Sequence, residues 1–466
     1  MRLAVVCALL FGYLIPVHTW ATDPLLPASL VETTQDLQSA GLSDRLGYTL
    51  VESLTTEVGP RLAGTESEAR ARSWAVKALR SLGFDNVRVE PFQVPIWTRG
   101  VERAEIISPY PQPLTVTALG GSRSTGPQGV HGELVRFESL AQLKAQANDS
   151  LQGKLVFVDE VMTRTQDGSG YGVAVAKRRA TAYEAERAGA LAALIRSVGT
   201  SSHRLPHTGQ MRRATELGPA GVPTAALSAP DADQLTRALA RAEAVEVKLT
   251  LTPETRPPAE SGNVIAEIPG RESREEIVLV GAHLDAWDLG TGAVDDGAGV
   301  GIVVAAAKLI RDLPSPPRRT IRVVLFGSEE VGLVGARAYA TQHAEELSQH
   351  IVAAESDFGA DRIWRFDTRF DASKQVFIEP LTGLLKPLGI GPGSRDARGG
   401  PDLLYLRQAG VPVVTLYQNG WDYFDLHHTP DDTLDKIDPV AMAQNVAAYA
   451  TFMYAVAEMP GHFRAE

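Results

Sequence analysis

The chain has 466 residues, of which 44% are hydrophobic and 22% are charged, and its formal net charge is −11. This length allows two or three domains, and the composition is that of an ordinary globular protein. The acidic balance and the absence of a long Lys/Arg run in the sequence argue against nucleic acid as a partner.

The N-terminus, residues 1–21, is predicted to be a signal peptide. Arg2 precedes an apolar run from Leu3 to Val17, and cleavage is expected after Ala21. The run is too short for a good spanning helix, and no other segment approaches one. We therefore expect an exported protein, periplasmic or secreted, that has no membrane contact after signal removal. The single cysteine, Cys7, lies within this signal, which excludes disulfides and Cys-ligated metal from the mature chain.

The next elements predict the start of a main domain. Residues 28–57 look helical, and a second helix begins at Thr65, which forms a capping-box spacing with Glu68. Residues 86–94 alternate like a strand. The pattern of apolar and polar residues changes near residue 119, so we assign residues 22–118 to the main domain.

Residues 119–249 are predicted to form an inserted α+β domain. Strand-like patterns occupy residues 129–137 and 153–160, residues 183–197 look helical, and a strand followed by a helix spans residues 221–239. The Pro-rich stretch at residues 252–262 is interpreted as a linker back to the main domain.

Residues 250–466 return to the main domain. Four short apolar runs alternate there with helical patterns such as residues 299–313 and 439–459. This alternation predicts an α/β domain with a mostly parallel mixed sheet flanked by helices. The four runs are residues 276–283, 320–326, 350–355 and 411–419. Ligands in such sheets bind beyond the carboxyl ends of the strands.

Acidic and imidazole side chains follow each of these runs. Any one of them alone would be a helix cap or a surface residue, but their convergence on one edge of a sheet predicts a metal site. They are His283 and Asp285, Glu329 and Glu330, Asp357, and His428, with Asp295 and Asp296 at the start of the helix that follows the first run.

The chemistry of this set favours zinc, with manganese or cobalt as alternatives, because it offers imidazole and carboxylate without sulfur. Five ligands exceed one tetrahedral site with an open position, so a carboxylate shared by two ions about 3.5–4 Å apart would use them all. In H-x-D the two side chains point the same way, so Asp285 is expected to orient His283 or a neighbouring group. Glu329 and Glu330 face apart, so one can bind metal while the other faces a water.

The order of these motifs, H-x-D, D-D, E-E, D and H-T-x-x-D-T, resembles that of the di-zinc exopeptidase superfamily of aminopeptidase and glutamate carboxypeptidase type. Within it, "HLDAWDLGTGAVDDGAG", "ESDFGA", "GGPDLLYLRQAGVPV" and "YFDLHHTPDDT" are most similar to the carboxypeptidase Q group, the plasma glutamate carboxypeptidase type. The insert resembles a protease-associated domain in "GKLVFVDE", "AERAGALAALI" and "GVPTAALS".

The resemblance implies two Zn²⁺ per chain and a role for each motif. Asp295 would bridge the ions, His283 and Asp357 would complete one site, and Glu330 and His428 would complete the other. Glu329 would be the general base toward a metal-bridging water. We choose His428 over His427 because the family pattern places the ligand directly before Thr. The family also suggests a homodimer.

The direction of cleavage is the least determined property. The resemblance favours a carboxypeptidase or dipeptidase acting on short peptides, with an aminopeptidase as the alternative. A substrate carboxylate would need donors, for which His207, Arg395 and Arg398 are candidates, although each also fits an ordinary surface position. Glutaminyl cyclase and a catalytically silent receptor ectodomain are the rival functions, and the complete ligand set argues against both.

Overall fold

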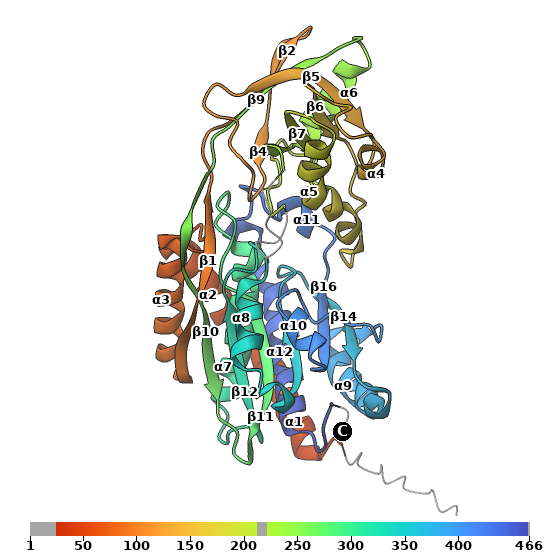
Figure 1. The fold of residues 1–466 in the computed structure, drawn as a ribbon. Helices are drawn as coiled ribbons and strands as arrows, with labels where there is room; N and C mark the ends of the chain where they lie inside the picture. The colour runs from red at the N-terminus through yellow and green to blue at the C-terminus, as the bar shows by residue number, and fades with distance from the viewer. Residues whose placement is uncertain (1–24, 212–220, 465–466) are drawn as a thin grey trace, which may run out of the picture.

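The computed structural model describes residues 25–211 and 221–464, which form two domains stacked end to end (Figure 1). The lower domain in that view contains a large mixed sheet, and the upper domain contains a second sheet. The signal peptide predicted at residues 1–21 lies outside the described residues. Within the described chain, every helix falls short of the length or the apolar character that a bilayer span requires.

The main sheet has eight strands in the order β1-β10-β12-β11-β13-β16-β14-β15. Strands β12, β11, β13 and β16 run parallel, whereas β10 pairs antiparallel with β12, and β14 with β16. The predicted mostly parallel mixed sheet is confirmed. The strands are β1 Asp85–Thr98, β10 Glu254–Ile268, β11 Ser273–His283, β12 Arg319–Phe326, β13 His350–Glu355, β14 Ile363–Arg369, β15 Gly391–Pro392 and β16 Val413–Gln418.

Helices cover both faces of this sheet because its central strands are apolar on both sides. Val278 and Val280 of β11 belong to one apolar cluster with α1, α2, α7 and α12, whereas Ile277 and Leu279 pack on the other face with α8 and α10. The helices are α1 Ala28–Leu42, α2 Leu46–Glu57, α3 Glu66–Ser81, α7 Ala298–Arg311, α8 Val334–Gln342, α9 Ile378–Leu385, α10 Leu404–Gln408, α11 Tyr423–Leu426 and α12 Pro439–Glu458.

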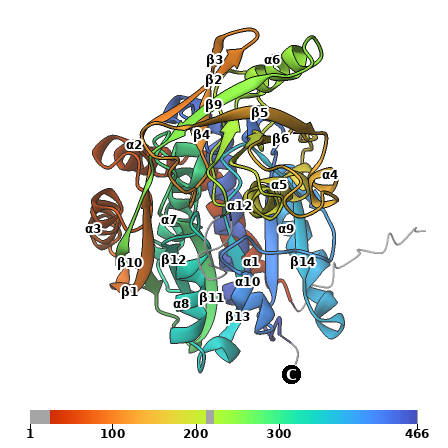
Figure 2. The same ribbon diagram turned by 45° about the horizontal axis from the view of Figure 1, so that its top comes forward.

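The inserted domain has its own eight-stranded sheet in the order β3-β2-β9-β5-β6-β7-β8-β4. Figure 2, with the top of the molecule turned forward, shows this sheet and α5 in front of the main domain. The elements are β2 Glu102–Ser108, β3 Gln112–Leu114, β4 Val116–Ala118, β5 Val130–Phe137, α4 Leu140–Lys144, β6 Leu155–Val158, α5 Ser169–Arg187, β7 Ala192–Arg196, β8 Thr224–Leu227, α6 Ala229–Leu239 and β9 Glu246–Leu251.

The boundary of the insert lies earlier than the predicted residue 119. Residues 102–118 form strands that pair within the second sheet, β2 with β9 and β4 with β8. The connection back to the main domain also differs, because residues 252–262 are not a free linker. Most of that stretch is the start of β10, which pairs with β1, and Pro257 and Pro258 lie at a register irregularity opposite Val94–Ile96.

The helical prediction for residues 28–57 agrees with the structure, which has helices α1 and α2 there with a break at residues 43–45. One local prediction needs correction. The pattern at residues 183–197 contains the end of α5 and then the buried parallel strand β7, because Gly189 turns the chain at a positive φ of 82°. The helix after Thr65 is confirmed, since the Thr65 hydroxyl accepts a hydrogen bond from the Glu68 amide.

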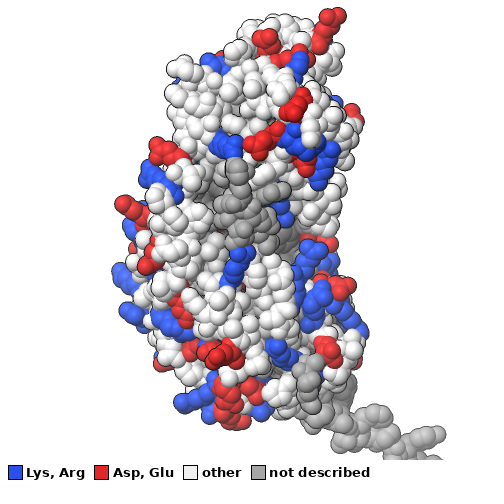
Figure 3. Space-filling view, viewed as in Figure 1, with Lys and Arg blue, Asp and Glu red and all other residues white. Residues whose placement is uncertain are grey.

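Charged side chains of both signs are interspersed over one face of the molecule. Figure 3 shows Lys and Arg beside Asp and Glu across the viewed face of both domains. A face of this kind has no large area of one sign that would steer a highly charged partner to it.

Candidate metal centre and active site

The carboxyl ends of the parallel strands bring the predicted ligands to one edge of the main sheet. His283 is the last residue of β11, Glu330 follows β12, and Asp357 follows β13. Asp295 lies in the turn that leads into α7, and His428 follows α11. Parallel strands end at the same edge, so segments separated by up to 145 positions in the sequence meet there.

One group of ligand atoms surrounds His283. Its Nε2 lies 3.2 Å from Asp295 Oδ1 and 3.6 Å from Asp357 Oδ1. Its Nδ1 donates to the backbone carbonyl of Asp285 at 2.9 Å, which leaves Nε2 as the free ligand atom. The ring is buried, so this orientation is held without exchange with solvent.

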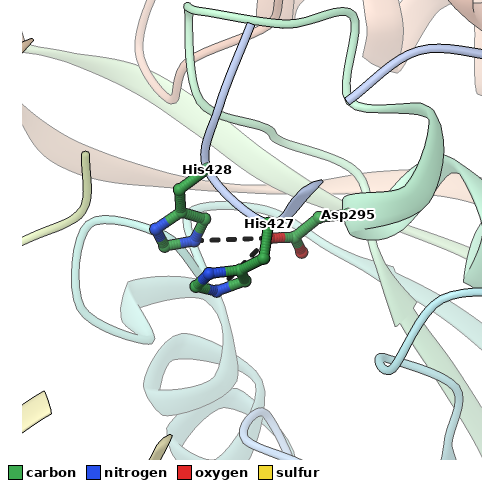
Figure 4. A group of neighbouring side chains, drawn as sticks. All are labelled: Asp295, His427 and His428. Atoms are coloured by element: carbon green, nitrogen blue, oxygen red, sulfur yellow. Dashed lines mark ion pairs between the residues drawn. The ribbon is translucent and has the colours of Figure 1, made fainter. Parts of the chain in front are cut away.

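A second group surrounds His428. Its Nε2 lies 3.0 Å from Glu330 Oε2 and 3.3 Å from Asp295 Oδ2. The two oxygens of Asp295 therefore face different groups, and Figure 4 shows this carboxylate directed at the histidine pair. His427 stacks on His428, but its Nε2 lies farther from Asp295, at 3.7 Å. This geometry fits the choice of His428 as the ligand.

The donor set fits zinc. Tetrahedral zinc with bonds of about 2.0–2.1 Å places its ligand atoms about 3.3 Å apart, which matches the spacings around His283 and His428. Oδ2 of Asp295 and Oε1 of Glu330 are buried and accept no hydrogen bond from any described residue. A buried carboxylate oxygen without a partner costs free energy, and a cation between the groups would remove that cost.

The acidic cluster is electrostatically strained without a cation. Burial raises the pKa of Glu329 well above its usual range; the His283 charge opposes the rise, and the adjacent Glu330 adds to it. Burial also raises the pKa of Asp357. Burial opposes ionisation of Asp295 too, but the neighbouring imidazoles of His283 and His428 hold its pKa well below its usual range. Asp295 is therefore the carboxylate that stays ionised most readily between the two groups.

Asp285 positions the two glutamates. Its Oδ1 accepts a hydrogen bond from the Glu329 amide at 3.0 Å, and its Oδ2 accepts one from the Glu330 amide at 3.3 Å. Of the two alternatives that the sequence left open, its carboxylate therefore holds a neighbouring group, while its backbone carbonyl orients His283. The same residue fixes the imidazole of one group and the backbone of Glu330 in the other.

Sequence reasoning missed two residues that hold the Asp295 turn. Asp432 accepts hydrogen bonds from the amides of Val294 at 2.6 Å and Asp295 at 3.3 Å. It is the second acid of "HTPDDT", so the motif contained the signal. Buried Arg61 donates to the carbonyls of Thr291 at 2.7 Å and Gly292 at 2.8 Å. Arg61 stands in an ordinary Gly-Pro-Arg loop, which gives no comparable signal.

Two further buried acids lie behind Asp357. Glu355 accepts a hydrogen bond from the Asp402 amide at 3.0 Å, and neither carboxylate oxygen of Asp402 has a partner among the described residues. Burial raises the pKa of both groups well above the usual range. The Glu355 carboxylate lies so close to Gly400 that a Cβ there would stand 2.1 Å from Oε2, which fixes the loop before Asp402.

A cavity of about 510 Å³ opens over the predicted ligands and lies between the two domains. Asp295, Glu329, Glu330, Asp357 and His428 line its floor, and α5 of the insert contributes a wall. Arg398 and Arg407 line the cavity too, and neither forms an ion pair with a carboxylate of the described chain. Arg407 instead donates to the Arg398 carbonyl at 2.6 Å.

The three residues predicted as substrate donors lie in different environments. Arg398 lines the cavity, but Arg395 is exposed, contacts Gln375 and is absent from the cavity lining. His207 is fully buried outside the cavity lining, and its Nδ1 donates to the His427 carbonyl at 2.7 Å. Burial lowers the pKa of His207 to about 4. Of the three candidates, only Arg398 is therefore placed on the cavity, and the structure gives neither His207 nor Arg395 a position from which to donate to a substrate there.

Comparison with known proteins agrees with this site. The sequence model "Peptidase family M28" matches residues 263–453. Carboxypeptidase Q from Bos taurus is 35% identical over 419 residues, which cover 90% of this chain and 87% of the bovine protein. The crystal structure of a peptidase M28 precursor from Shewanella amazonensis SB2B has 49% identity and a TM-score of 0.91, covering 94% of this chain and 99% of that one. The structure of BSAP, a zinc aminopeptidase from Bacillus subtilis, is 21% identical and has a TM-score of 0.65. The match covers 89% of this chain and 95% of the BSAP chain, and it shows a shared fold.

Proposed function

This chain belongs to peptidase family M28 and is a metallopeptidase, and we propose that it is an exported di-zinc carboxypeptidase or dipeptidase of short peptides. One observation carries the proposal: a single carboxylate, Asp295, faces two separate histidine–carboxylate groups at the floor of a cavity. That arrangement supports two ions, one held by His283 and Asp357 and the other by Glu330 and His428. Bound zinc would lower the pKa of a water and stabilise negative charge on the substrate carbonyl oxygen.

Glu329 is proposed as the general base. It lines the cavity beside Glu330 but is not needed by either ligand group. Its carboxylate accepts the proton of the attacking water and then delivers that proton to the amine that leaves. The hydrogen bond from the Glu329 amide to Asp285 keeps the backbone of this residue fixed while its side chain exchanges the proton. Burial raises the pKa of Glu329, which strengthens it as a base.

The wall of the cavity supports a substrate with a free carboxylate. Arg398 and Arg407 offer guanidinium donors without a competing carboxylate in the described chain, and guanidinium binds carboxylates in a bidentate manner. The similarity to carboxypeptidase Q supports the same direction of cleavage. A specific observation favours the alternative, an aminopeptidase: Asp167 also lines the cavity and could bind a free amine, although it lies 3.8 Å from the Arg365 guanidinium.

A substrate panel separates these activities. The purified mature chain, loaded with zinc, is assayed on a free dipeptide, an N-acetylated dipeptide, a C-terminally amidated dipeptide and an aminoacyl anilide. We expect cleavage of substrates with a free carboxylate, and a dipeptidase would additionally require the free amine. Preferential cleavage of the anilide and the amidated peptide would establish an aminopeptidase instead.

Arginine variants give the panel a matched control. Replacing Arg398 and Arg407 together by alanine should raise KM for free-carboxylate peptides about tenfold or more, because each loses a charge-assisted hydrogen bond. Arg395→Ala removes an arginine from the same loop that does not line the cavity, and KM should stay unchanged. An equal effect of both changes would remove the carboxylate-binding role of the cavity arginines.

Two further features belong to the proposal. The N-terminal signal sequence supports export to the periplasm or the exterior, and mass spectrometry of secreted protein would locate the cleavage site. The family resemblance supports a homodimer, which sedimentation of the purified chain would test. We also propose that the insert is a protease-associated domain.

A further inference from the structure

The segment that carries His428 contacts the inserted domain through an unusually complete set of polar groups. We call this set the latch: it comprises Arg164, Thr200, His207 and Thr208 of the insert with Asp425, His427 and His428 of the main domain. The segment follows β16 and includes the short helix α11, and His428 itself has a positive φ of 62°, which non-glycine residues rarely adopt. Such a backbone needs support from its surroundings.

Arg164 and Thr200 hold the start of the segment. Arg164 donates to the two carboxylate oxygens of Asp425 at 2.7 and 2.9 Å, and the Thr200 hydroxyl donates to the same carboxylate at 2.7 Å. The Thr200 amide also donates to the Phe424 carbonyl at 3.0 Å. These groups are only partly exposed, so the ion pair is better shielded from solvent than a surface pair.

His207 and Thr208 hold its end. The His207 Nδ1 donates to the His427 carbonyl at 2.7 Å, and the Thr208 amide donates to the His428 carbonyl at 3.0 Å. The His207 amide in turn donates to the Ser197 hydroxyl at 2.9 Å, which fixes this loop within the insert. Both carbonyls flanking the ligand histidine are therefore fixed by the other domain.

The imidazole of His428 is oriented by the insert as well. Its Nδ1 lies 3.2 Å from the Thr208 carbonyl, which leaves Nε2 for Glu330 and Asp295. Gly209 has a φ of 129°, and a Cβ there would stand 2.8 Å from this Nδ1. The close packing leaves the ring little freedom to rotate. A ligand histidine usually has such a partner on its second nitrogen, and loss of that partner typically weakens metal binding about 10- to 100-fold.

We propose that the inserted domain is a structural part of the Glu330–His428 metal site and sets its affinity for zinc. The four insert residues of the latch act as positioning residues, because they contact the ligand segment and not the metal. The inference rests on the proposed assignment of His428 as a ligand, and it adds a role for the insert beyond forming the wall of the cavity. The His283–Asp357 site has no comparable contact with the insert among the described residues, so the two sites should respond differently.

Zinc affinity measured by equilibrium dialysis against zinc buffers tests the proposal. For the full mature chain, we expect two zinc ions. In His207→Ala the dissociation constant of the ion at the Glu330–His428 site should rise about tenfold, the lower end of the range for a ligand's own partner, because His207 holds the backbone beside His428 and not its imidazole. The dissociation constant of the other ion should stay unchanged. His207→Asn should restore most of the affinity, because the asparagine amide can donate where Nδ1 does. His203→Ala, which removes an exposed histidine from the same loop, should bind like the unaltered chain.

A second pair of variants keeps the test valid if His207→Ala does not fold. Arg164→Gln and Asp425→Asn should each weaken binding of the same ion. The effect of the double variant should be smaller than the sum of the two single effects, because the Arg164–Asp425 ion pair is lost in both. Glu330→Gln removes a proposed ligand of that ion, so it identifies which dissociation constant belongs to the Glu330–His428 site. Retention of both ions at unaltered affinity, or equal loss of both, would overturn the proposal, and so would a single ion in the unaltered chain. Two ions with the expected response but no peptide hydrolysis would instead refute the proposed function alone.

Discussion

Replacing Asp285 by asparagine tests whether this residue positions the general base. Asp285 accepts the amides of Glu329 and Glu330 on its two oxygens. Asparagine has the same shape but only one carbonyl oxygen, so one buried amide loses its acceptor and faces an NH₂ group. An unsatisfied buried donor costs about 1–3 kcal/mol. If that cost displaces Glu329 from its reactive position, kcat should fall about 5- to 150-fold.

The assay measures kcat and zinc content together. Zinc content at the His283 group should be kept, because a backbone carbonyl and not the Asp285 carboxylate orients that imidazole. Asp371→Asn is the matched control: this exposed aspartate also accepts two hydrogen bonds, from the amide and hydroxyl of Ser373, but lies far from the cavity lining. Full turnover in Asp285→Asn would refute the positioning role, and loss of turnover in proportion to lost zinc would assign the residue to metal binding instead.

Three other outcomes follow from the site and the fold. Glu329→Gln should keep its zinc, measured by elemental analysis, while kcat falls about 10²- to 10⁴-fold. A zinc-loaded variant with unchanged kcat would contradict the role of Glu329 as general base. A chelator should abolish turnover and lower Tm, because the ligand carboxylates lose their cation, and added zinc should restore both. Burial lowers the pKa of His350 to about 4, so the unfolded state binds more protons and stability should fall by roughly 3 kcal/mol between pH 6.5 and 4. Urea unfolding should show that slope flattened in His350→Gln; an unchanged slope would exclude His350 as its source.

The fold class was predictable because it depends on periodicity along the chain. Buried parallel strands are near-continuous apolar runs, and those before His283, Glu329 and Asp357 stood out for that reason. The ligands were predictable for a related reason, since parallel strands end at one edge and polar residues that follow them must meet there. No knowledge of loop conformation was needed for either step.

The misplaced boundaries arise from pairing between distant residues. Strands β2 and β4 are short, and their place in the second sheet depends on β9 and β8, more than 100 residues later. The first half of β10 is polar and exposed and pairs only with β1, so its sequence has the composition of a linker. Local propensity cannot identify a strand whose main stabilisation is a long-range ladder.

The two candidate donors that lie off the cavity share a different cause. His207 and Arg395 were judged by charge alone, but a histidine on a loop becomes a neutral hydrogen-bond donor once a second loop covers it. That cover comes from the segment around His427, about 220 positions away. The same contact explains why the insert matters to the site: a ligand on a short, strained segment needs a partner, and here another domain provides it. A catalytic domain cut at the insert boundaries would therefore retain all five proposed ligands and still lack the groups that orient His428.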